Sequence, residues 1–196
     1  MAQMIVPTSR KQIAFYEDLL KYGGSSLRKS LGACFQCGTC TASCPTRFAM
    51  DHPPRRLLRM VQLGMKDEVL SSSTIWLCVS CKSCIARCPR GADMSEIMAA
   101  LKNMAIKEGA KAEVKGAPTF YKTFVNVVKK YGRLSESMLM MQYFIKRLAI
   151  KETLQYAPLG LMFYKKGKLP IKPEKIAQRN HIKSMVKNIS LIEKGK

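Results

Sequence analysis

The stretch that decides the fold is Cys34-Phe-Gln-Cys37-Gly-Thr-Cys40-Thr-Ala-Ser-Cys44-Pro45. It recurs 44 residues later as Cys78-Val-Ser-Cys81-Lys-Ser-Cys84-Ile-Ala-Arg-Cys88-Pro89, with the same spacing and no gap. All eight cysteines of the chain lie in these two runs. An internal repeat of this kind predicts two copies of one ligand-binding unit.

The spacing C-x2-C-x2-C-x3-C-P is that of bacterial-type ferredoxins, in which three thiolates at steps of three residues surround one [4Fe-4S] cluster. The fourth cysteine points away and binds the other cluster. This crossing rule predicts two [4Fe-4S] clusters, and we name their ligand sets by the run that supplies three of the four cysteines. The first site consists of Cys34, Cys37, Cys40 and Cys88, and the second site consists of Cys78, Cys81, Cys84 and Cys44.

Zinc and disulfides are the alternative uses of such cysteines. Four-cysteine zinc sites usually take two separated C-x2-C pairs rather than three consecutive steps and a fourth cysteine. Disulfides are typical of small secreted proteins, and the N-terminal segment MAQMIVPTSRKQ has no apolar signal region. The sequence therefore favours a cytoplasmic protein with reduced thiols that bind metal.

The charge is strongly positive and unevenly distributed. The chain has 196 residues with 34 Lys and Arg against 13 Asp and Glu, a formal net charge of +21. Residues 1–110 contain 15 basic and eight acidic residues, whereas residues 111–196 contain 19 basic and five acidic ones. This excess predicts an acidic partner, either protein, nucleic acid or a membrane surface, although a solvated Lys-rich surface is also possible.

Helical patterns cover most of residues 1–110. A helix is expected from Ser9, whose capping box includes Gln12, and another after the Asp51-His-Pro-Pro segment. A third should begin at a capping box of Asp93 and Glu96. Their predicted apolar faces comprise Ile13, Tyr16 and Leu20, then Leu57, Leu58, Val61 and Met65, then Ile97, Leu101 and Met104.

Residues 111–196 predict a helical hairpin, a Lys- and Pro-rich extended segment at 165–175 and a last helix. The apolar stripes are Phe120, Phe124, Val127 and Tyr131, then Leu134, Met138, Met141, Ile145 and Leu148, then Ile182, Met185, Ile189 and Ile192. The longest other apolar stretches, 138–150 and 154–164, are too short to span a membrane. No strand pattern of useful length occurs, so we expect an all-α fold with a cluster domain at 1–110 and a basic helical extension at 111–196.

Motifs for substrate chemistry are missing. The sequence has no G-x-G-x-x-G, no Walker loop and no Ser-His-Asp or Cys-His arrangement once the cysteines serve as ligands. Two clusters without a substrate site predict an electron carrier between other subunits. We expect no nucleic-acid partner, because the aromatic residues lie on apolar helical faces and the lysines are dispersed.

The segments CFQCGTCTASCP and HPPRRLLRMVQLGMKDEVLSSSTIWLCVSCKSCIARCP closely resemble the C-type iron-sulfur subunit of heterodisulfide reductases and their bacterial relatives. The resemblance is strong over residues 30–108 and weaker over FYKTFVNVVKKYGR. It implies an α-helical ferredoxin fold and the two cysteine runs as cluster ligands. It also implies a hetero-oligomer in which residues 116–196 wrap around a partner subunit.

By this resemblance, the function is electron relay between two partners, an A-type subunit with a flavin and clusters and a B-type subunit with the disulfide-reducing site. The CCG motifs of the B-type partner are absent here, so the chain is not a fused form. The segment KGKLPIKPEKI is more similar to members from bacterial sulfur oxidation. The alternative is the iron-sulfur subunit of another flavin-dependent or quinone-linked oxidoreductase.

Overall fold

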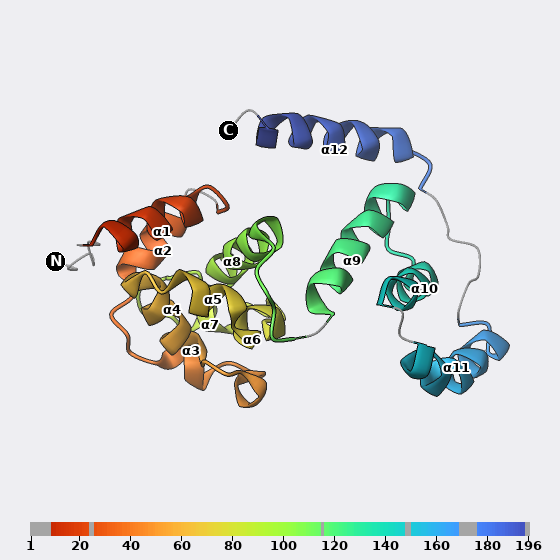
Figure 1. The fold of residues 1–196 in the computed structure, drawn as a ribbon, viewed down its shortest axis with the longest axis horizontal. Helices are drawn as coiled ribbons and strands as arrows, with labels where there is room; N and C mark the ends of the chain where they lie inside the picture. The colour runs from red at the N-terminus through yellow and green to blue at the C-terminus, as the bar shows by residue number, and fades with distance from the viewer. Residues whose placement is uncertain (1–8, 24–25, 115, 148–149, 169–175, 195–196) are drawn as a thin grey trace. The chain divides into compact units, whose positions relative to one another are not determined.

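The computed structural model describes residues 9–23, 26–114, 116–147, 150–168 and 176–194. The chain divides into two compact units, Met1–Lys115 and Gly116–Lys196. The regular structure of the described residues is helical, which confirms the expected all-α fold (Figure 1).

The first unit is built around one long helix, α8. Five other helices of this unit, α1, α2, α5, α6 and α7, pack against it. Side chains at the centre are fully buried, among them Leu19, Leu57, Ile75, Ile97 and Leu101. The elements of the unit are α1 (Arg10–Leu20), α2 (Ser26–Ala33), α3 (Thr39–Ala42), the 3-10 turn η1 (Arg47–Ala49), α4 (Pro54–Leu63), α5 (Lys66–Ser71), α6 (Ser73–Leu77), α7 (Ser83–Ala86) and α8 (Met94–Glu108).

Helix α1 begins with the predicted capping box but buries a different face. Gln12 N–H donates to Ser9 Oγ at 3.2 Å, and Ser9 N–H donates to Gln12 Oε1 at 3.1 Å. The buried residues are Phe15 and Leu19, whereas Ile13 is exposed. The predicted face of Ile13, Tyr16 and Leu20 is therefore wrong by about one residue, because Phe15 and Leu19 face the core.

Helix α8 has half of its predicted capping box. The Asp93 side chain accepts the N–H of Glu96 at 3.0 Å, as expected for an N-cap. The Asp93 N–H, which a capping box would give to Glu96, donates to Ser30 Oγ at 3.0 Å, and the Glu96 carboxylate accepts the Ser26 hydroxyl. The two partners, Ser26 and Ser30, both lie in α2. Hydrogen bonds to another helix therefore replace the second hydrogen bond of the local capping box.

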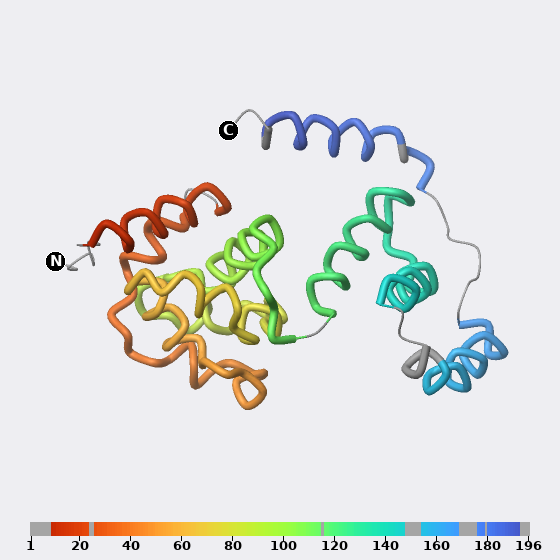
Figure 2. The backbone as a smooth tube through the Cα atoms, viewed as in Figure 1, coloured from red at the N-terminus to blue at the C-terminus, as the bar shows by residue number. Residues whose placement is uncertain are grey.

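The cysteine runs lie mostly in loops around two very short helices. The tube in Figure 2 shows the first run as the irregular chain before and after α3. The predicted helix after Asp51 is α4, whose buried residues include Leu57, Leu58 and Val61. Helices α3 and α7 are in contact, as are α3 and α4, so the two runs meet in one place.

The second unit contains α9 (Ala117–Tyr131), α10 (Glu136–Arg147), α11 (Ile150–Lys165) and α12 (Arg179–Lys194). Helices α9 and α10 form the predicted hairpin. Its small core consists of Val127, Tyr131 and Leu139, with Phe120, Phe124, Leu134 and Met138 packed against it.

Some expectations for this unit are wrong. In α10 the buried residue is Leu139, while Met141 and Ile145 are exposed, because the helix presents a different face to α9. The apolar stripe of α12 forms a helix, but Met185, Ile189 and Ile192 are exposed. Leu148 and residues 169–175, most of the segment expected to be extended, lie outside the described residues.

The sequence patterns assign no helix to residues 150–165, where the structure has α11, and Pro158 lies inside this helix. Across the described part of the chain, no helix combines the length and the apolar character that crossing a bilayer requires.

Candidate cluster-binding site

The two cysteine runs adopt the same loop conformation. Gln36 and Ser80 occupy equivalent positions and have φ of 66° and 53°. Gly38 and Lys82 are likewise equivalent, with φ of 89° and 60°, and each precedes a four-residue helix, α3 or α7. Positive φ is uncommon outside glycine. Where right-handed and left-handed backbone conformations alternate along a loop, successive N–H groups turn to the same side. They then form a concave site that suits anions such as iron-sulfur clusters.

The second cysteine of each run is exposed and is hydrogen-bonded to a hydroxyl group two residues later. Cys37 Sγ lies 3.3 Å from Thr39 Oγ1, and Cys81 Sγ lies 3.5 Å from Ser83 Oγ. These hydroxyl groups lower the pKa of both thiols. A lowered pKa makes the thiolate, the form that binds metal, easier to reach at both positions.

The third cysteine of each run is partly buried at the second position of its short helix. Burial raises the pKa of Cys40 and raises the pKa of Cys84 to about 11. The neighbouring sulfurs of Cys34 and Cys78, respectively, add to this effect. A thiolate at either place needs a compensating positive charge, which the iron of a bound cluster supplies.

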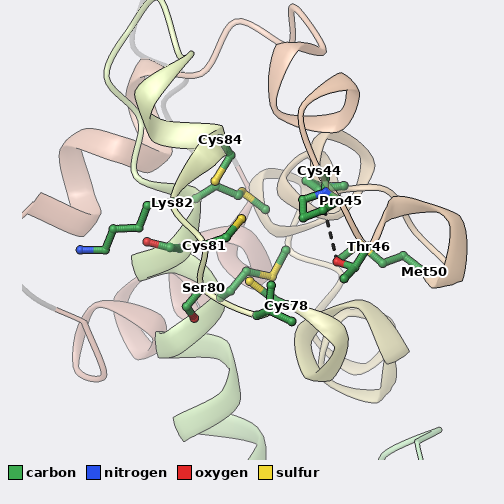
Figure 3. A pocket seen from close by; sticks show the side chains of 14 residues that line it. Cys44, Pro45, Thr46, Met50, Cys78, Ser80, Cys81, Lys82 and Cys84 are labelled. Atoms are coloured by element: carbon green, nitrogen blue, oxygen red, sulfur yellow. Dashed lines mark hydrogen bonds between the residues drawn. The ribbon is translucent and has the colours of Figure 1, made fainter.

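A pocket brings the fourth cysteine of the first run to the second run. Figure 3 shows Cys78, Cys81 and Cys84 from one segment of the chain with Cys44, Pro45 and Thr46 from the other. Thr46 Oγ1 lies 3.5 Å from Cys44 Sγ. The remaining lining is mainly apolar, with Met50, Pro54, Val79, Met94 and Met98.

The fourth cysteine of the second run lies beside the first. Burial raises the pKa of Cys34, and Cys88 is the neighbouring sulfur that adds most to this rise. Cys88 Sγ also accepts the N–H of Ala92 at 3.3 Å. The fold thus places Cys44 with the second run and Cys88 next to the first, the arrangement that crossed ligation requires.

The separation of the cysteine side chains in space suits a cluster better than a single metal ion. All eight are free thiols. Within the described ranges, no three Cys, His, Asp or Glu side chains are gathered closely enough to hold a single metal ion. A [4Fe-4S] cluster binds each of its four thiolates at a different iron, so its ligands are spread around a cube.

Three polar residues near the first run were not predicted as part of the site. Gln36 donates to Cys34 Sγ from its backbone N at 3.4 Å and from Nε2 at 3.6 Å. Arg55 donates to the Gln36 carbonyl at 3.5 Å, and Arg59 lies close enough to Cys34 to lower its pKa. Gln36 could have been noticed from its place between two ligands, but both arginines come from α4 and only the tertiary fold brings them near.

Asp51 links the two runs and was predicted only as part of a helix start. Its carboxylate accepts Ser72 Oγ–H, Thr74 Oγ1–H and the N–H groups of Ser73, Thr74 and His52, at 2.6–3.1 Å. Of these partners, Ser72, Ser73 and Thr74 lie at the start of α6, which leads directly into Cys78. The side chain of Trp76 in α6, two residues before Cys78, is buried, and a buried indole beside a cluster ligand keeps water away.

Comparison with known proteins agrees with this site. Residues 33–92 match the family model described as a 4Fe-4S dicluster domain. Over 84 residues the chain is 43% identical to the C-type iron-sulfur subunit of the CoB--CoM heterodisulfide reductase of Methanopyrus kandleri, covering 43% of this chain and 44% of that protein. It is 45% identical over 102 residues to a C-type subunit of the same name from Methanocaldococcus jannaschii, covering 50% and 54%.

A third relative is the C-type subunit of the H(2):CoB-CoM heterodisulfide,ferredoxin reductase of Methanothermobacter marburgensis, 40% identical over 98 residues that cover 50% of this chain and 51% of that protein. The chain thus spans about half the length of the curated relatives it matches. The dicluster domain and the eight cysteines together identify two [4Fe-4S] clusters as the cofactors. Residues 33–92 thus form a 4Fe-4S dicluster domain, and about half of the chain is similar to C-type iron-sulfur subunits of heterodisulfide reductase.

Proposed function

We propose that this chain is the electron-transfer subunit of a heterodisulfide reductase or a heterodisulfide reductase-like complex. In this role it relays electrons between a flavin-containing A-type subunit and a B-type subunit that carries CCG motifs and the disulfide-reducing site. The coarser description, an iron-sulfur electron-transfer subunit, already follows from the dicluster domain and the named relatives. The complex is expected in the cytoplasm, where thiols stay reduced.

The pocket that joins Cys44 to Cys78, Cys81 and Cys84 is the observation that carries the proposal. It supports crossed ligation, in which this set forms the second site. Cys34, Cys37, Cys40 and Cys88 then form the first site. Crossed ligation places the two clusters side by side, as electron transfer between them requires.

The residues of the chain then have three tasks. The cysteines hold the clusters, and the hydroxyl and amide groups around their sulfurs set how readily each site accepts an electron. The apolar pocket lining and the buried Trp76 keep water away from the second site. When bound, each cluster supplies one-electron redox chemistry, so the chain itself needs no acid, base or nucleophile.

The unit Gly116–Lys196 is proposed to dock onto the partner subunits, and α11 is the strongest support for this. Its large apolar side chains are exposed, namely Leu154, Tyr156, Leu159, Leu161, Met162, Phe163 and Tyr164. At roughly 100° per residue, these positions surround the whole helix rather than one face. Such a helix fits a groove in another protein that covers it on several sides.

Charge supports the same docking. Lys165, Lys166 and Lys168 follow the apolar part of α11 directly. A basic cluster next to an apolar anchor fits a protein groove with an acidic rim, since opposite charges fix orientation and speed association.

The test is to isolate the tagged chain anaerobically from its native source and to identify its partners by mass spectrometry. We expect a flavoprotein and a CCG-motif protein in amounts stoichiometric with the chain. The control is the tag expressed alone in the same cells. A flavin dehydrogenase without any CCG-motif protein would instead support the alternative oxidoreductase and overturn the proposal.

A further inference from the structure

The two sites differ in polarity although their loops share one backbone conformation. The 44-residue offset allows each position of the first run to be compared with its counterpart in the second. Gln36 corresponds to Ser80, and Thr41 corresponds to Ile85. In both pairs the first run has the residue with the greater ability to donate a hydrogen bond to sulfur.

The sulfurs of the first site receive more hydrogen bonds among the described residues. Cys34 accepts two from Gln36, at 3.4 and 3.6 Å, and Cys88 accepts one from Ala92 N–H at 3.3 Å. Cys37 pairs with the Thr39 hydroxyl at 3.3 Å.

The sulfurs of the second site have fewer partners. Ser83 pairs with Cys81 and Thr46 pairs with Cys44, each at 3.5 Å. The second run has a hydroxyl to match Thr39 but has the apolar Ile85 where the first run has Thr41. Among the described residues, Ser80, the counterpart of Gln36, makes no hydrogen bond to a cysteine sulfur.

Positive charge lies near both sites, so charge alone does not distinguish them. The charges of Arg55 and Arg59 act on Cys37 and Cys34, respectively. Near the second site, Lys102 donates to the backbone oxygen of Cys78 at 2.9 Å. Lys82 lines the pocket of the second site, although its side chain extends away from the labelled cysteines in Figure 3.

Reduction adds a negative charge to a site that is already anionic. Hydrogen bonds to cysteine sulfur and nearby cations stabilise that charge and raise the reduction potential, while an apolar lining destabilises it. The first site has more hydrogen bonds to sulfur, and the pocket of the second site is lined mainly by methionine, proline and valine side chains, with Thr46, Ser80, Lys82 and Ser95 beside them.

We propose that the first site has the higher reduction potential, so that the chain favours electron transfer from the second site to the first. In this transfer the second site loses one electron and the first gains it, and no proton or bond is exchanged. An electron donor then docks near the second site and an acceptor near the first. This inference rests on the proposed ligand sets.

The test is a mediated potentiometric titration of the full-length chain, purified anaerobically with both clusters and followed by EPR. We expect two one-electron steps. Gln36→Ser gives the first run the residue that the second run has, and should shift only the more positive step to lower potential. Thr39→Val, which removes the hydroxyl beside Cys37 and keeps the branched shape, should shift the same step.

Ser83→Ala is the matched control, because it removes the hydroxyl beside Cys81 in the second site. It should lower only the more negative step. The proposal is overturned if Gln36→Ser or Thr39→Val moves the more negative step, or if the two steps coincide. Iron analysis separates this failure from failure of the proposed ligand sets. About eight iron atoms per chain together with the opposite order of reduction potentials would refute only the proposed order. About four iron atoms per wild-type chain would refute the assignment of two cluster sites.

Discussion

Asp51 is the residue that ties the two cysteine runs together. It follows Cys44 by seven positions, and its carboxylate binds the start of α6, four residues before Cys78. Burial alone would raise the pKa of Asp51, but the hydrogen bonds from Thr74, Ser72, His52 and Ser73 outweigh it and hold the pKa far below its usual value. The carboxylate is therefore charged and stabilising at neutral pH.

We expect Asp51→Asn to destabilise the cluster-loaded chain by about 2 kcal/mol, because the charge is lost and an NH2 group faces donors. It should also speed the loss of iron from the second site, since Cys44 and Cys78 are no longer held together. Thermal unfolding and iron release to a chelator measure the two effects. Asp67→Asn, an exposed acid in the first turn of α5, is the control and should change little.

The contribution of Asp51 should depend on pH in one direction. A carboxyl group with a lowered folded-state pKa stabilises fully above its ordinary pKa of 3.8, and this stability is lost as the pH falls toward the folded-state value. The difference in unfolding temperature between wild type and Asp51→Asn should be the same at pH 7 and pH 6. A difference that grows as the pH falls from 7 to 6 would point to another group.

At the scale of elements, α1 and α4 pack closely at the glycine that ends α4. Gly64 has φ of 78°, and a Cβ atom there would lie 2.9 Å from the Cα and 3.1 Å from the backbone N of Gln12. Backbone atoms cannot move aside as a flexible side chain can. Gly109, which ends α8, has a similar φ of 68° but has open space around it.

We expect Gly109→Ala to cost about 1 kcal/mol, the strain of a left-handed alanine. Gly64→Ala should cost clearly more, because α1 must also move away from α4. Unfolding temperatures of the two cluster-loaded variants measure the difference. Equal destabilisation would show that the contact between α1 and α4 is not tight.

Some elements could be predicted from sequence and others could not, for physical reasons. The caps at Ser9 and Asp93 use local hydrogen bonds, so their residues could be recognised in the sequence. The N–H of Asp93, however, donates to Ser30, 63 residues away in the chain, instead of to Glu96. No local sequence pattern reveals this hydrogen bond. The buried faces of α1 and α10 were misjudged because apolar residues surround both helices and packing chooses among them.

At the scale of the molecule, the chain combines a cluster unit with a unit whose apolar side chains remain exposed. Helix α11 contacts α10, where the rings of Phe144 and Tyr156 stack with centroids 6.3 Å apart. Beyond that contact most of its large side chains are exposed. This arrangement is expected of a docking segment that is covered only in a complex.

We expect the double substitution Leu161→Gln with Met162→Gln to weaken association with the partner subunits by at least about tenfold, since buried anchor residues dominate binding energy. Both clusters should remain. Met140→Gln with Met141→Gln makes the same change at two exposed positions of α10 and is the control. Quantitative co-purification measures the effect, and unchanged partner recovery for the α11 variant would argue against docking through α11.

The sequence was most informative about the cysteines and least informative about their surroundings. Eight ligands at a repeated spacing predict two clusters because iron-sulfur chemistry fixes that spacing. By contrast, Gln36 and Arg59 affect the first site through side-chain reach and the packing of α4, which the spacing does not encode. The same is true of the apolar pocket at the second site.

The most direct test of the central claim, two clusters with crossed ligation, compares two double variants by iron content and EPR. Cys44→Ser with Cys78→Ser should damage only the second site and keep about four iron atoms and one unperturbed cluster signal. Cys34→Ser with Cys44→Ser should perturb both signals, because one ligand is lost from each site. The opposite result, one intact cluster in the Cys34 and Cys44 variant and two damaged clusters in the other, would contradict crossed ligation.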